Sequence, residues 1–286
     1  MTSPRMTGAA YLLDKSAGIY SRRAASRVAK QWGYRKYGHA GTLDPDATGL
    51  LIVLLGRATR LSRFITSSIK TYSFGIKLGS RTDTDDTSGT VLESRPVPPI
   101  TEEDILKVLC NYTGAISQKV PDYSAVRVDG SRAYSLARKG LDPSTPVREV
   151  YTENWKLEEI KGPLVSLSVT VSSGTYIRAL ARDIGNELGT GGAAFDIRRT
   201  SIGAFRIEEA SKDTRNIKSL LTMPDILRDF EKAVLGEEDS LTVSHGGSVS
   251  GAAVGTIALL DKDDNLLAVA QGDGSILKPL CVFTGN

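Results

Sequence analysis

The segment Gly38-His39-Ala40-Gly41-Thr42-Leu43-Asp44-Pro45-Asp46-Ala47-Thr48-Gly49-Leu50 joins a polar, glycine-rich loop to an apolar run. Residues 50–55 are all aliphatic, which predicts a buried strand or the start of a buried helix. Pro45 has a fixed φ and biases Asp44 towards an extended backbone. Asp44 therefore lies in a stiff frame beside a buried element, where a scaffold can hold a reactive group. A structural turn explains the same residues, because Asp-Pro commonly opens a turn.

A known motif decides between these two interpretations. Read from Gly38, the residues fill every fixed position of G-H-x-G-x-L-D-P-x-A-x-G-x-L, the catalytic motif of the TruB-type tRNA pseudouridine synthases. The chain therefore resembles that family. In the family, the aspartate at the position of Asp44 is the catalytic residue, so the resemblance favours a catalytic loop over a plain turn.

Three further segments resemble motifs of the same family, in the same order along the chain. Residues 118–127 resemble Q-x-P-P-x-Y-S-A-x-K, with valine in place of the first proline and Arg127 in place of the lysine. Residues 174–178 match G-T-Y-I-R. Residues 197–203 resemble L-R-R-T-x-x-G, with Ile197 in place of the leucine that packs on the target base. Four ordered motifs are hard to reach by chance, and they extend the resemblance to nearly the whole chain.

The resemblance implies a fold and a division into domains. The fold is α+β, the pseudouridine synthase fold, with a mixed, mainly antiparallel central sheet and a small C-terminal β module that is PUA-like. We expect the catalytic domain to span 1–235, with an RNA-clasping insertion at about 118–150. The PUA-like module is expected over 239–286.

Apolar periodicity predicts individual elements. Strands are expected at 9–13, 71–78, 165–171 and 280–283, and a hairpin at 256–260 and 266–271. A first helix is expected from Ser21, as the cap, to about Trp32, with a buried stripe that starts at Tyr20. A second is expected from the cap Thr101, with Asp104, to about Gly114, and a third from about 174 to Gly189. Residues 223–238 are expected to form a helix and a linker. The acidic turn at 81–87 lacks the ligand spacing of an EF-hand, so we assign it no metal.

The resemblance also implies a set of site residues. They are Asp44 as the catalytic residue and His39, Tyr72, Tyr176, Arg178, Ile197 and Arg127 as substrate-binding residues. Arg178 is expected to pair with Asp44 through the planar fork of its guanidinium and to stabilise the ionised carboxylate. Tyr72 is expected to stack on the base and to assist deprotonation at carbon 5. A structural salt bridge for Arg178 and core packing for Tyr72 are the alternatives that the residues alone allow.

The remaining substrate contacts follow from the same resemblance. Tyr176 and Ile197 would form the walls of the pocket, and His39 would hold the extruded nucleotide. Arg127 keeps the positive charge of the family's lysine, although the two side chains are not interchangeable at a tight contact. For Tyr176, core packing is again the alternative.

The implied reaction converts uridine 55 in the T loop of tRNA to pseudouridine. The uracil leaves C1′, rotates and reattaches through carbon 5, so the reaction involves no net redox change and requires no cofactor. Asp44 could attack C1′, attack the base or remove the 2′ proton, and the sequence leaves these three open. Two other functions remain as alternatives. One is a guide-RNA-dependent pseudouridine synthase component, and the other is a non-catalytic RNA-binding protein on the same fold.

Charge and composition agree with an RNA substrate. The net charge is +3, but residues 236–286 hold seven acidic and two basic residues, a net −5, so the first 235 residues carry +8. A basic body suits a polyanionic partner, whereas the acidic tail is expected to add little to RNA affinity. Cys110 and Cys281 form no C-x-x-C pair, and two histidines are too few for a usual metal cluster. No signal peptide or membrane-spanning segment is evident, so we expect a cytoplasmic protein. The resemblance implies tRNA, through its T arm, as the partner, and we expect a monomer.

Overall fold

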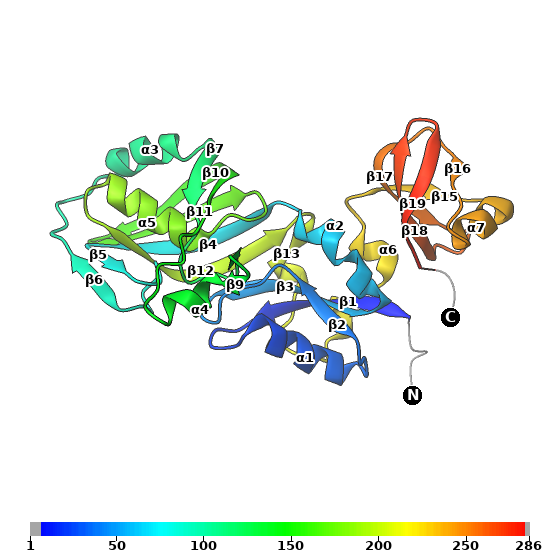
Figure 1. The fold of residues 1–286 in the computed structure, drawn as a ribbon, viewed down its shortest axis with the longest axis horizontal. Coiled ribbons are helices and arrows are strands. Elements are labelled where there is room, and N and C mark those ends of the chain that lie inside the picture. Colours follow the sequence, from blue (N-terminus) through cyan, green and yellow to red (C-terminus); the bar gives the residue numbers. More distant parts are fainter. Residues whose placement is uncertain (1–6, 284–286) are drawn as a thin grey trace.

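The computed structural model describes residues 7–283. Figure 1 shows an elongated molecule in which one large sheet occupies most of the length and a smaller sheet lies at one end, in the orange and red part of the chain. The large sheet has ten strands and the smaller has five. Within the described residues, no helix is long and apolar enough to cross a membrane.

The large sheet runs in the order β14-β1-β3-β12-β4-β11-β10-β7, with β13 paired to β12 and β2 paired to β3. Its strands are β1 Gly8–Lys15, β2 Tyr37–Ala40, β3 Thr48–Gly56, β4 Lys70–Leu78, β7 Gly114–Lys119, β10 Val147–Lys161, β11 Leu164–Val171, β12 Gly192–Ile202, β13 Phe205–Arg206 and β14 Leu220–Leu221. Among the strands described in this sheet, only β3 and β12 pair in parallel. The predicted mixed, mainly antiparallel sheet is therefore confirmed.

Strand β3 shows why the aliphatic run after the loop is a strand and not a helix. Leu50, Ile52 and Leu54 pack into one core cluster, which also takes in residues of the small sheet. Leu51 and its alternate neighbours pack into another, against helix α1 Ser21–Gln31. Because successive side chains of a strand point to opposite faces, a continuous aliphatic run is what a strand buried on both faces needs.

The other helices are α2 Ser62–Thr66, α3 Glu102–Asn111, α4 Ala133–Ala137, α5 Ile177–Glu187, α6 Met223–Ile226 and α7 Glu237–Ser244, with short 3-10 turns at η1 Arg57–Leu61, η2 Ile207–Glu209 and η3 Ile217–Ser219. Of these helices, α3 and α5 lie along the large sheet, α7 lies beside the small sheet and α4 belongs to a projecting arm (Figure 1). The predicted cap of α3 is confirmed, because Thr101 and Asp104 form a reciprocal capping box.

The predicted cap of α1 is wrong. The N-cap residue is Tyr20, which makes no side-chain cap and is 63% exposed, so it does not begin a buried stripe. Ser21 is the first helical residue, and its hydroxyl bonds instead to the backbone of Leu43 in the loop before β3. A Ser at a helix start signals a cap from sequence alone, but here a partner that is distant in sequence claims the hydroxyl.

The smaller sheet has the order β15-β17-β18-β19-β16. Its strands are β15 Glu231–Val234, β16 Val249–Ser250, β17 Val254–Leu260, β18 Leu266–Asp273 and β19 Ile276–Val282. The predicted hairpin corresponds to β17 and β18, and the last predicted strand to β19. The prediction of helix and linker over 223–238 missed β15, which pairs in parallel with β17. Four residues are too few to show a strand period, and long-range pairing decides the outcome.

The two sheets share one hydrophobic core. A single cluster contains Leu12 and Ile52 of the large sheet together with Leu260 and Val269 of the small one. Three arginines also cross the junction, and each donates to a backbone carbonyl. Arg57 bonds to Phe283 O at 2.7 Å, Arg60 to Val282 O at 2.5 Å and Arg63 to Leu280 O at 2.9 Å. The small sheet is thus packed and hydrogen-bonded onto the body.

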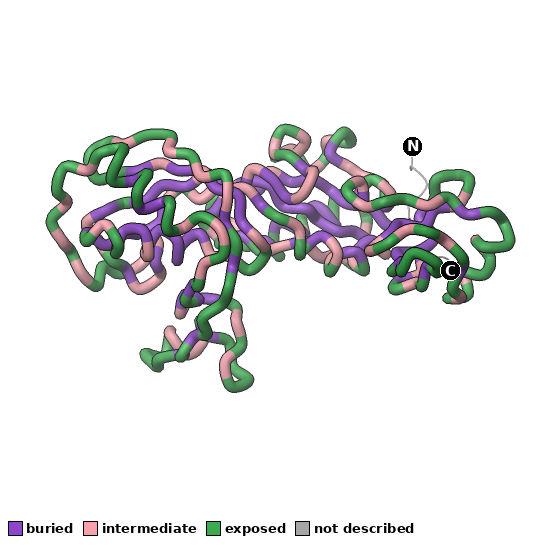
Figure 2. Tube along the Cα trace, turned by 90° about the horizontal axis from the view of Figure 1, so that it is seen from above, coloured by how far each residue is buried: buried purple, intermediate pink, exposed green. Residues whose placement is uncertain are grey.

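An arm projects from the middle of the molecule. It carries the short hairpin of β8 Arg127–Val128 and β9 Ser131–Arg132, followed by α4. Figure 2 shows it standing clear of the body, with most of its trace exposed or half-buried. A separate two-stranded sheet of β5 Ser80–Thr82 and β6 Val91–Ser94 closes the acidic turn at 82–87.

Candidate active site

The loop that carries Asp44 is fixed from both sides. Leu43 and Ala47 are buried, and the hydroxyl of Ser21 both donates to the carbonyl and accepts from the amide of Leu43, at 2.8 and 2.9 Å. The ammonium group of Lys15 donates to Pro45 O at 2.8 Å. The backbone of Asp44 is therefore held between two anchors, while 47% of its side chain stays exposed. A carboxylate presented in this way can reach a bound substrate.

Arg178 pairs with Asp44, as predicted. Its Nε lies 2.8 Å from Asp44 Oδ2, and only 6% of the arginine side chain is exposed. The contact uses one nitrogen and not the two-pronged fork that we expected. Both Nη atoms are engaged elsewhere, Nη1 with Thr84 O at 2.6 Å and Nη2 with Tyr123 O at 3.1 Å. The backbone carbonyls fix the guanidinium plane, and Nε is left to face the carboxylate.

The acidic turn between β5 and β6 contributes to this arrangement. Besides Thr84 O, it places Asp86 Oδ2 at 3.7 Å from Arg178 Nε. The other oxygen of Asp86 accepts from the Thr84 hydroxyl at 2.7 Å and from the Ser88 hydroxyl at 2.6 Å, which fixes the carboxylate. Sequence reasoning had given this turn no role. The signal was available as a dense run of acidic and hydroxyl residues, but nothing in the spacing pointed to an arginine far along the chain.

A second buried arginine, Arg199, ties Tyr72 to the loop. It is 1% exposed and donates from Nε to Leu50 O at 2.8 Å and from Nη2 to Gly41 O at 3.0 Å. Its Nη1 lies 3.3 Å from the hydroxyl of Tyr72. Tyr72 itself is 7% exposed and packs in the same core cluster as Leu43. Tyr72 is thus part of the hydrophobic core and, through Arg199, is also connected to the loop that carries Asp44.

The electrostatic setting of the loop is dominated by buried cations. Burial lowers the pKa of Lys15 to about 8, against the opposing influence of Asp46 and Asp44. Burial, followed by the nearby charge of Arg199, lowers the pKa of His39, so its imidazole is neutral at pH 7. The Nδ1 atom of His39 is buried and has no hydrogen-bond partner within residues 7–283. Lys15 was missed by sequence reasoning, although a lysine that ends an apolar strand is a visible signal.

The remaining predicted residues divide into two groups. Tyr176, just before α5, has its backbone amide and carbonyl bonded to the buried amide side chain of Gln118, at 2.8 and 3.2 Å. Ile197, on β12, is half-buried and packs against the cluster that contains Tyr72. Arg127 lies apart from these residues, exposed on strand β8 of the arm. Arg178 thus contacts Asp44 directly, whereas Tyr72 and Ile197 pack with the cluster that holds Leu43 of the same loop.

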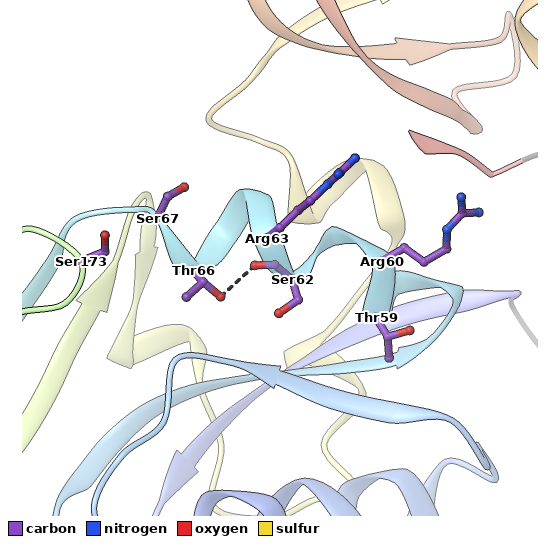
Figure 3. Close-up of a pocket in the computed structure, with 7 residues that line it drawn as sticks. All are labelled: Thr59, Arg60, Ser62, Arg63, Thr66, Ser67 and Ser173. Carbon is purple, nitrogen blue, oxygen red and sulfur yellow. Dashed lines mark hydrogen bonds between the residues drawn. The ribbon is translucent and has the colours of Figure 1, made fainter. Parts of the chain in front are cut away.

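The surface pocket drawn in Figure 3 is a different place. It is lined by Thr59, Arg60, Ser62, Arg63, Thr66, Ser67 and Ser173, none of which belongs to the predicted set. Arg60 and Arg63 extend there towards the small sheet, whose carbonyls they bond. Within the described part of the chain, no group of three His, Cys, Asp or Glu side chains is placed to hold a metal ion.

Solved structures identify the class of protein that this fold defines. The chain is similar to "Crystal Structure of a Cbf5-Nop10-Gar1 Complex", with a TM-score of 0.74 and 23% identity over 98% of this chain and 86% of that one. It is also similar to "Structure of H/ACA RNP bound to a substrate RNA containing 2'-deoxyuridine", with a TM-score of 0.74 and 22% identity over 97% and 85% of the two chains. The fold is that of the pseudouridine synthases, as predicted.

Sequence comparison gives the family. Residues 29–177 match the model of the TruB family pseudouridylate synthase (N terminal domain). The chain is 36% identical to tRNA pseudouridine synthase B of Thermobifida fusca, over 98% of this chain and 100% of the relative. It is 42% identical to the protein of the same name from Syntrophobacter fumaroxidans, over 70% of this chain and 65% of the relative. The chain belongs to the TruB family of pseudouridylate synthases, which confirms the resemblance.

Proposed function

We propose that this enzyme converts uridine 55 in the T loop of tRNA to pseudouridine, with Asp44 as the catalytic residue. The names of the relatives, which are tRNA pseudouridine synthases over nearly the full length of the chain, support tRNA as the substrate class. The net charge of +8 on the first 235 residues suits the same polyanion. The observation that carries the proposal is the half-exposed carboxylate of Asp44, held by the buried Arg178.

The reaction rearranges bonds within one nucleotide. The bond from N1 to C1′ breaks, a bond from C5 to C1′ forms, the proton leaves C5, and N1 gains one. Asp44 presents its carboxylate from the loop, with 47% of the side chain exposed, and it acts as nucleophile or as base. Arg178 aims the carboxylate, and its attraction is strengthened because the ion pair is shielded from water on the arginine side.

The neighbouring side chains would bind the base after it has left the stack. Tyr72 would stack on the uracil and assist removal of the C5 proton, while Tyr176 and Ile197 form walls. A neutral His39 would hold the flipped nucleotide. Arg127 would contact the RNA from the arm. Extruding the base costs on the order of a few kcal/mol, which contacts to the RNA backbone must offset.

We further propose that the enzyme acts alone, as a monomer in the cytoplasm. The large sheet would carry the catalytic domain, and the small sheet would form the PUA-like module that follows it. Since β15 pairs with the small sheet, the boundary is better placed near residue 230 than at 235. The solved structures that come from guide-RNA particles share the fold, but the relatives are named as tRNA enzymes, which favours activity without a guide.

Replacing Asp44 with Asn tests the proposal. Asparagine has nearly the size of aspartate but lacks its charge and nucleophilicity, so single-turnover formation of pseudouridine on a T-arm stem-loop should fall by more than about a hundredfold. RNA affinity should be kept, because it depends on backbone contacts and loop shape. Asp46→Asn is the matched control, since Asp46 is also an exposed carboxylate of the same loop. The control should retain near wild-type turnover.

Three results would contradict parts of the proposal. Turnover of Asp44→Asn close to that of the wild type would remove Asp44 from the chemistry. Wild-type protein that binds the stem-loop without modifying it would favour a non-catalytic RNA-binding protein. Activity that appears only after a guide RNA and partner proteins are added would favour the guide-dependent alternative.

A further inference from the structure

Helix α5 presents a second arginine one turn beyond the one that contacts Asp44. Arg178 and Arg182 are four residues apart, so both point from the same face of the helix. Arg182 is nearly as buried as Arg178, with 14% of its side chain exposed. A buried guanidinium needs hydrogen-bond acceptors for its N–H groups. The acceptors that Arg182 bonds therefore indicate its role.

Arg182 contacts the same two segments as Arg178. Its Nη1 donates to Asp85 Oδ2 at 2.9 Å, in the acidic turn, and its Nη2 donates to Lys119 O at 3.0 Å, at the base of the arm. Arg178 reaches the same turn and the chain just beyond that base, through its two backbone carbonyl contacts. The remaining donors of Arg182 go to the adjacent Asp183, at 2.8 and 3.1 Å. Arg178 and Arg182 thus both connect the acidic turn and the base of the arm to helix α5.

The acidic turn is otherwise attached by its backbone to strand β12. Asp85 O accepts from the amide of Ala194 at 2.9 Å, and the amide of Thr87 donates to Ala194 O at 2.9 Å. Asp85 has a φ of 61°, an unfavourable value for a side chain other than glycine, asparagine or aspartate. Its carboxylate is 10% exposed and is held by Arg182. Fixing this residue also fixes the carbonyl of Thr84, which is its immediate neighbour and the partner of Arg178.

We propose that Arg182, with Asp85 as its carboxylate partner, is a positioning residue for the Arg178–Asp44 pair. The inference rests on the proposed function, in which that pair performs the chemistry. Arg182 does not touch the substrate. It holds Thr84 and the base of the arm at the distances at which Arg178 can bond both carbonyls and still present Nε to Asp44. A displacement of about 1 Å at a reacting group can lower a rate by about a hundredfold.

Arg182→Met tests the inference, because methionine keeps the apolar stem and removes the donors. We expect single-turnover pseudouridine formation on a T-arm stem-loop to fall by about tenfold or more, with the RNA Kd changed by less than about threefold. Asp85→Asn is the second variant. Asparagine retains an oxygen acceptor and tolerates a positive φ, so Asp85→Asn should stay folded. It therefore tests the inference even if Arg182→Met, which leaves the buried carboxylate of Asp85 without its charge partner, fails to fold.

Arg95→Met is the matched control. Arg95, which directly follows β6, forms a short pair with Glu93 of that strand, with Nε to Oε1 at 2.7 Å, beside the acidic turn. That pair is exposed on both sides, at 37% and 41%, and does not involve α5. The control should keep the wild-type rate. It would then show that the loss of rate in Arg182→Met comes from losing Arg182, and not from losing any arginine near the acidic turn.

A double-mutant cycle with Arg178→Lys decides between positioning and a general loss of stability. If Arg182 acts through Arg178, then Arg182→Met or Asp85→Asn should lower the rate further by less than about twofold in the Arg178→Lys background. A full additive loss would overturn the inference, and so would a wild-type rate in the folded single variants. An inactive wild type would instead contradict the proposed function, so the two failures are distinct.

Discussion

Arg178 contacts Asp44 through a single nitrogen, and that geometry makes a prediction for lysine. The guanidinium serves three acceptors at once, Asp44 and the carbonyls of Thr84 and Tyr123. Lysine has one nitrogen on a flexible stem and cannot meet three acceptors in these directions. Arg178→Lys should therefore lower the single-turnover rate by about a hundredfold, with RNA affinity changed by only a few-fold.

The measurement is rapid-quench pseudouridine formation with saturating enzyme, and RNA affinity is determined on the same preparation. The variant keeps a cation beside Asp44, so a loss of rate reports geometry and not charge. A rate within about threefold of the wild type would show that the positive charge alone is sufficient.

The glycine that follows the loop is required by close packing. Gly49 has a φ of +100°, and a Cβ there would lie 2.2 Å from Arg199 O. Gly49→Ala should therefore displace β3 from β12, destabilise the protein by more than about 1 kcal/mol and lower activity through Arg199. Gly38→Ala is the control within the same motif, because the nearest atom to its Cβ is 3.8 Å away. Thermal unfolding of both variants checks the prediction, which fails if the two midpoints shift equally.

At the residue scale, the sequence could predict some of the groups that act through side chains but none of those that act through the backbone. The resemblance to the family's motifs implied that Asp44 and Arg178 pair. The carbonyls of Thr84 and Tyr123, which orient the arginine, leave no trace in residue type, because any residue has a carbonyl. Arg199 lay inside a quoted motif and yet received no role, since nothing in a local pattern shows that an arginine on a strand is fully buried.

At the scale of elements, the acidic turn combines a cost in stability with a fixed geometry. Burial raises the pKa of Asp85 from its ordinary 3.8 to about 6, although Arg182 and Arg178 oppose the shift and Asp183 adds to it. The carboxylate is nevertheless ionised at pH 7, where it meets Arg182. A buried ion pair often contributes little to stability and is retained for the arrangement it imposes.

This shift gives the pH dependence of stability a definite sign. Because the pKa of Asp85 is higher in the folded than in the unfolded state, the folded protein binds more protons between the two values. The contribution of Asp85 is then fully present below about pH 4 and is lost as the pH rises through about 6. Asp85→Asn stays neutral throughout. Its free energy of unfolding, relative to that of the wild type, should rise across this window.

Denaturant unfolding of both proteins at a series of pH values between about 4 and 7 measures this difference. Asp83→Asn is a useful control, because Asp83 belongs to the same turn but is less buried than Asp85. A relative stability of Asp85→Asn that falls with rising pH would mean that the attraction of Arg182 outweighs burial.

Predictions of strands and helix caps succeeded where a local sequence pattern is clear, and they failed where a partner distant in the sequence determines the structure. Strands β4 and β11 alternate in sequence over 71–78 and 165–171, and both were predicted. The four residues of β15 form a strand only because β17 lies beside them. In the same way, Ser21 was expected to cap its own helix, but its hydroxyl bonds to Leu43, which is 22 residues away in the sequence.

At the scale of the whole molecule, the small sheet is less independent than its sequence suggested. We expected an acidic module joined by a linker, but its residues complete a core cluster together with Leu12 and Ile52 of the body. Removing 239–286 would therefore expose apolar surface of the body and leave β15 without its partner. The module is better tested inside the full-length chain, by weakening its attachment.

The arginines at the junction offer that test. Arg57 and Arg60 donate to the carbonyls of Phe283 and Val282, and the guanidinium of Arg60 also lies 5.2 Å from the centre of the Phe283 ring. Arg57→Met/Arg60→Met removes these donors and keeps the apolar stems. Each charge-assisted hydrogen bond is worth roughly 1.5–3 kcal/mol. Amide hydrogen exchange in β19 should therefore accelerate, while exchange in β4, at the centre of the large sheet, should stay unchanged.

Arg23→Met, on the exposed side of α1, is the control for the loss of positive charge alone and should change neither strand. Unchanged exchange in β19 of the double variant would mean that the shared apolar core by itself holds the small sheet in place. Acceleration in β4 as well would mean that the two sheets unfold as one unit, because local opening of the module would then carry the body with it. The location of the faster amides thus decides whether the acidic module is a separate folding unit or the last layer of the catalytic body.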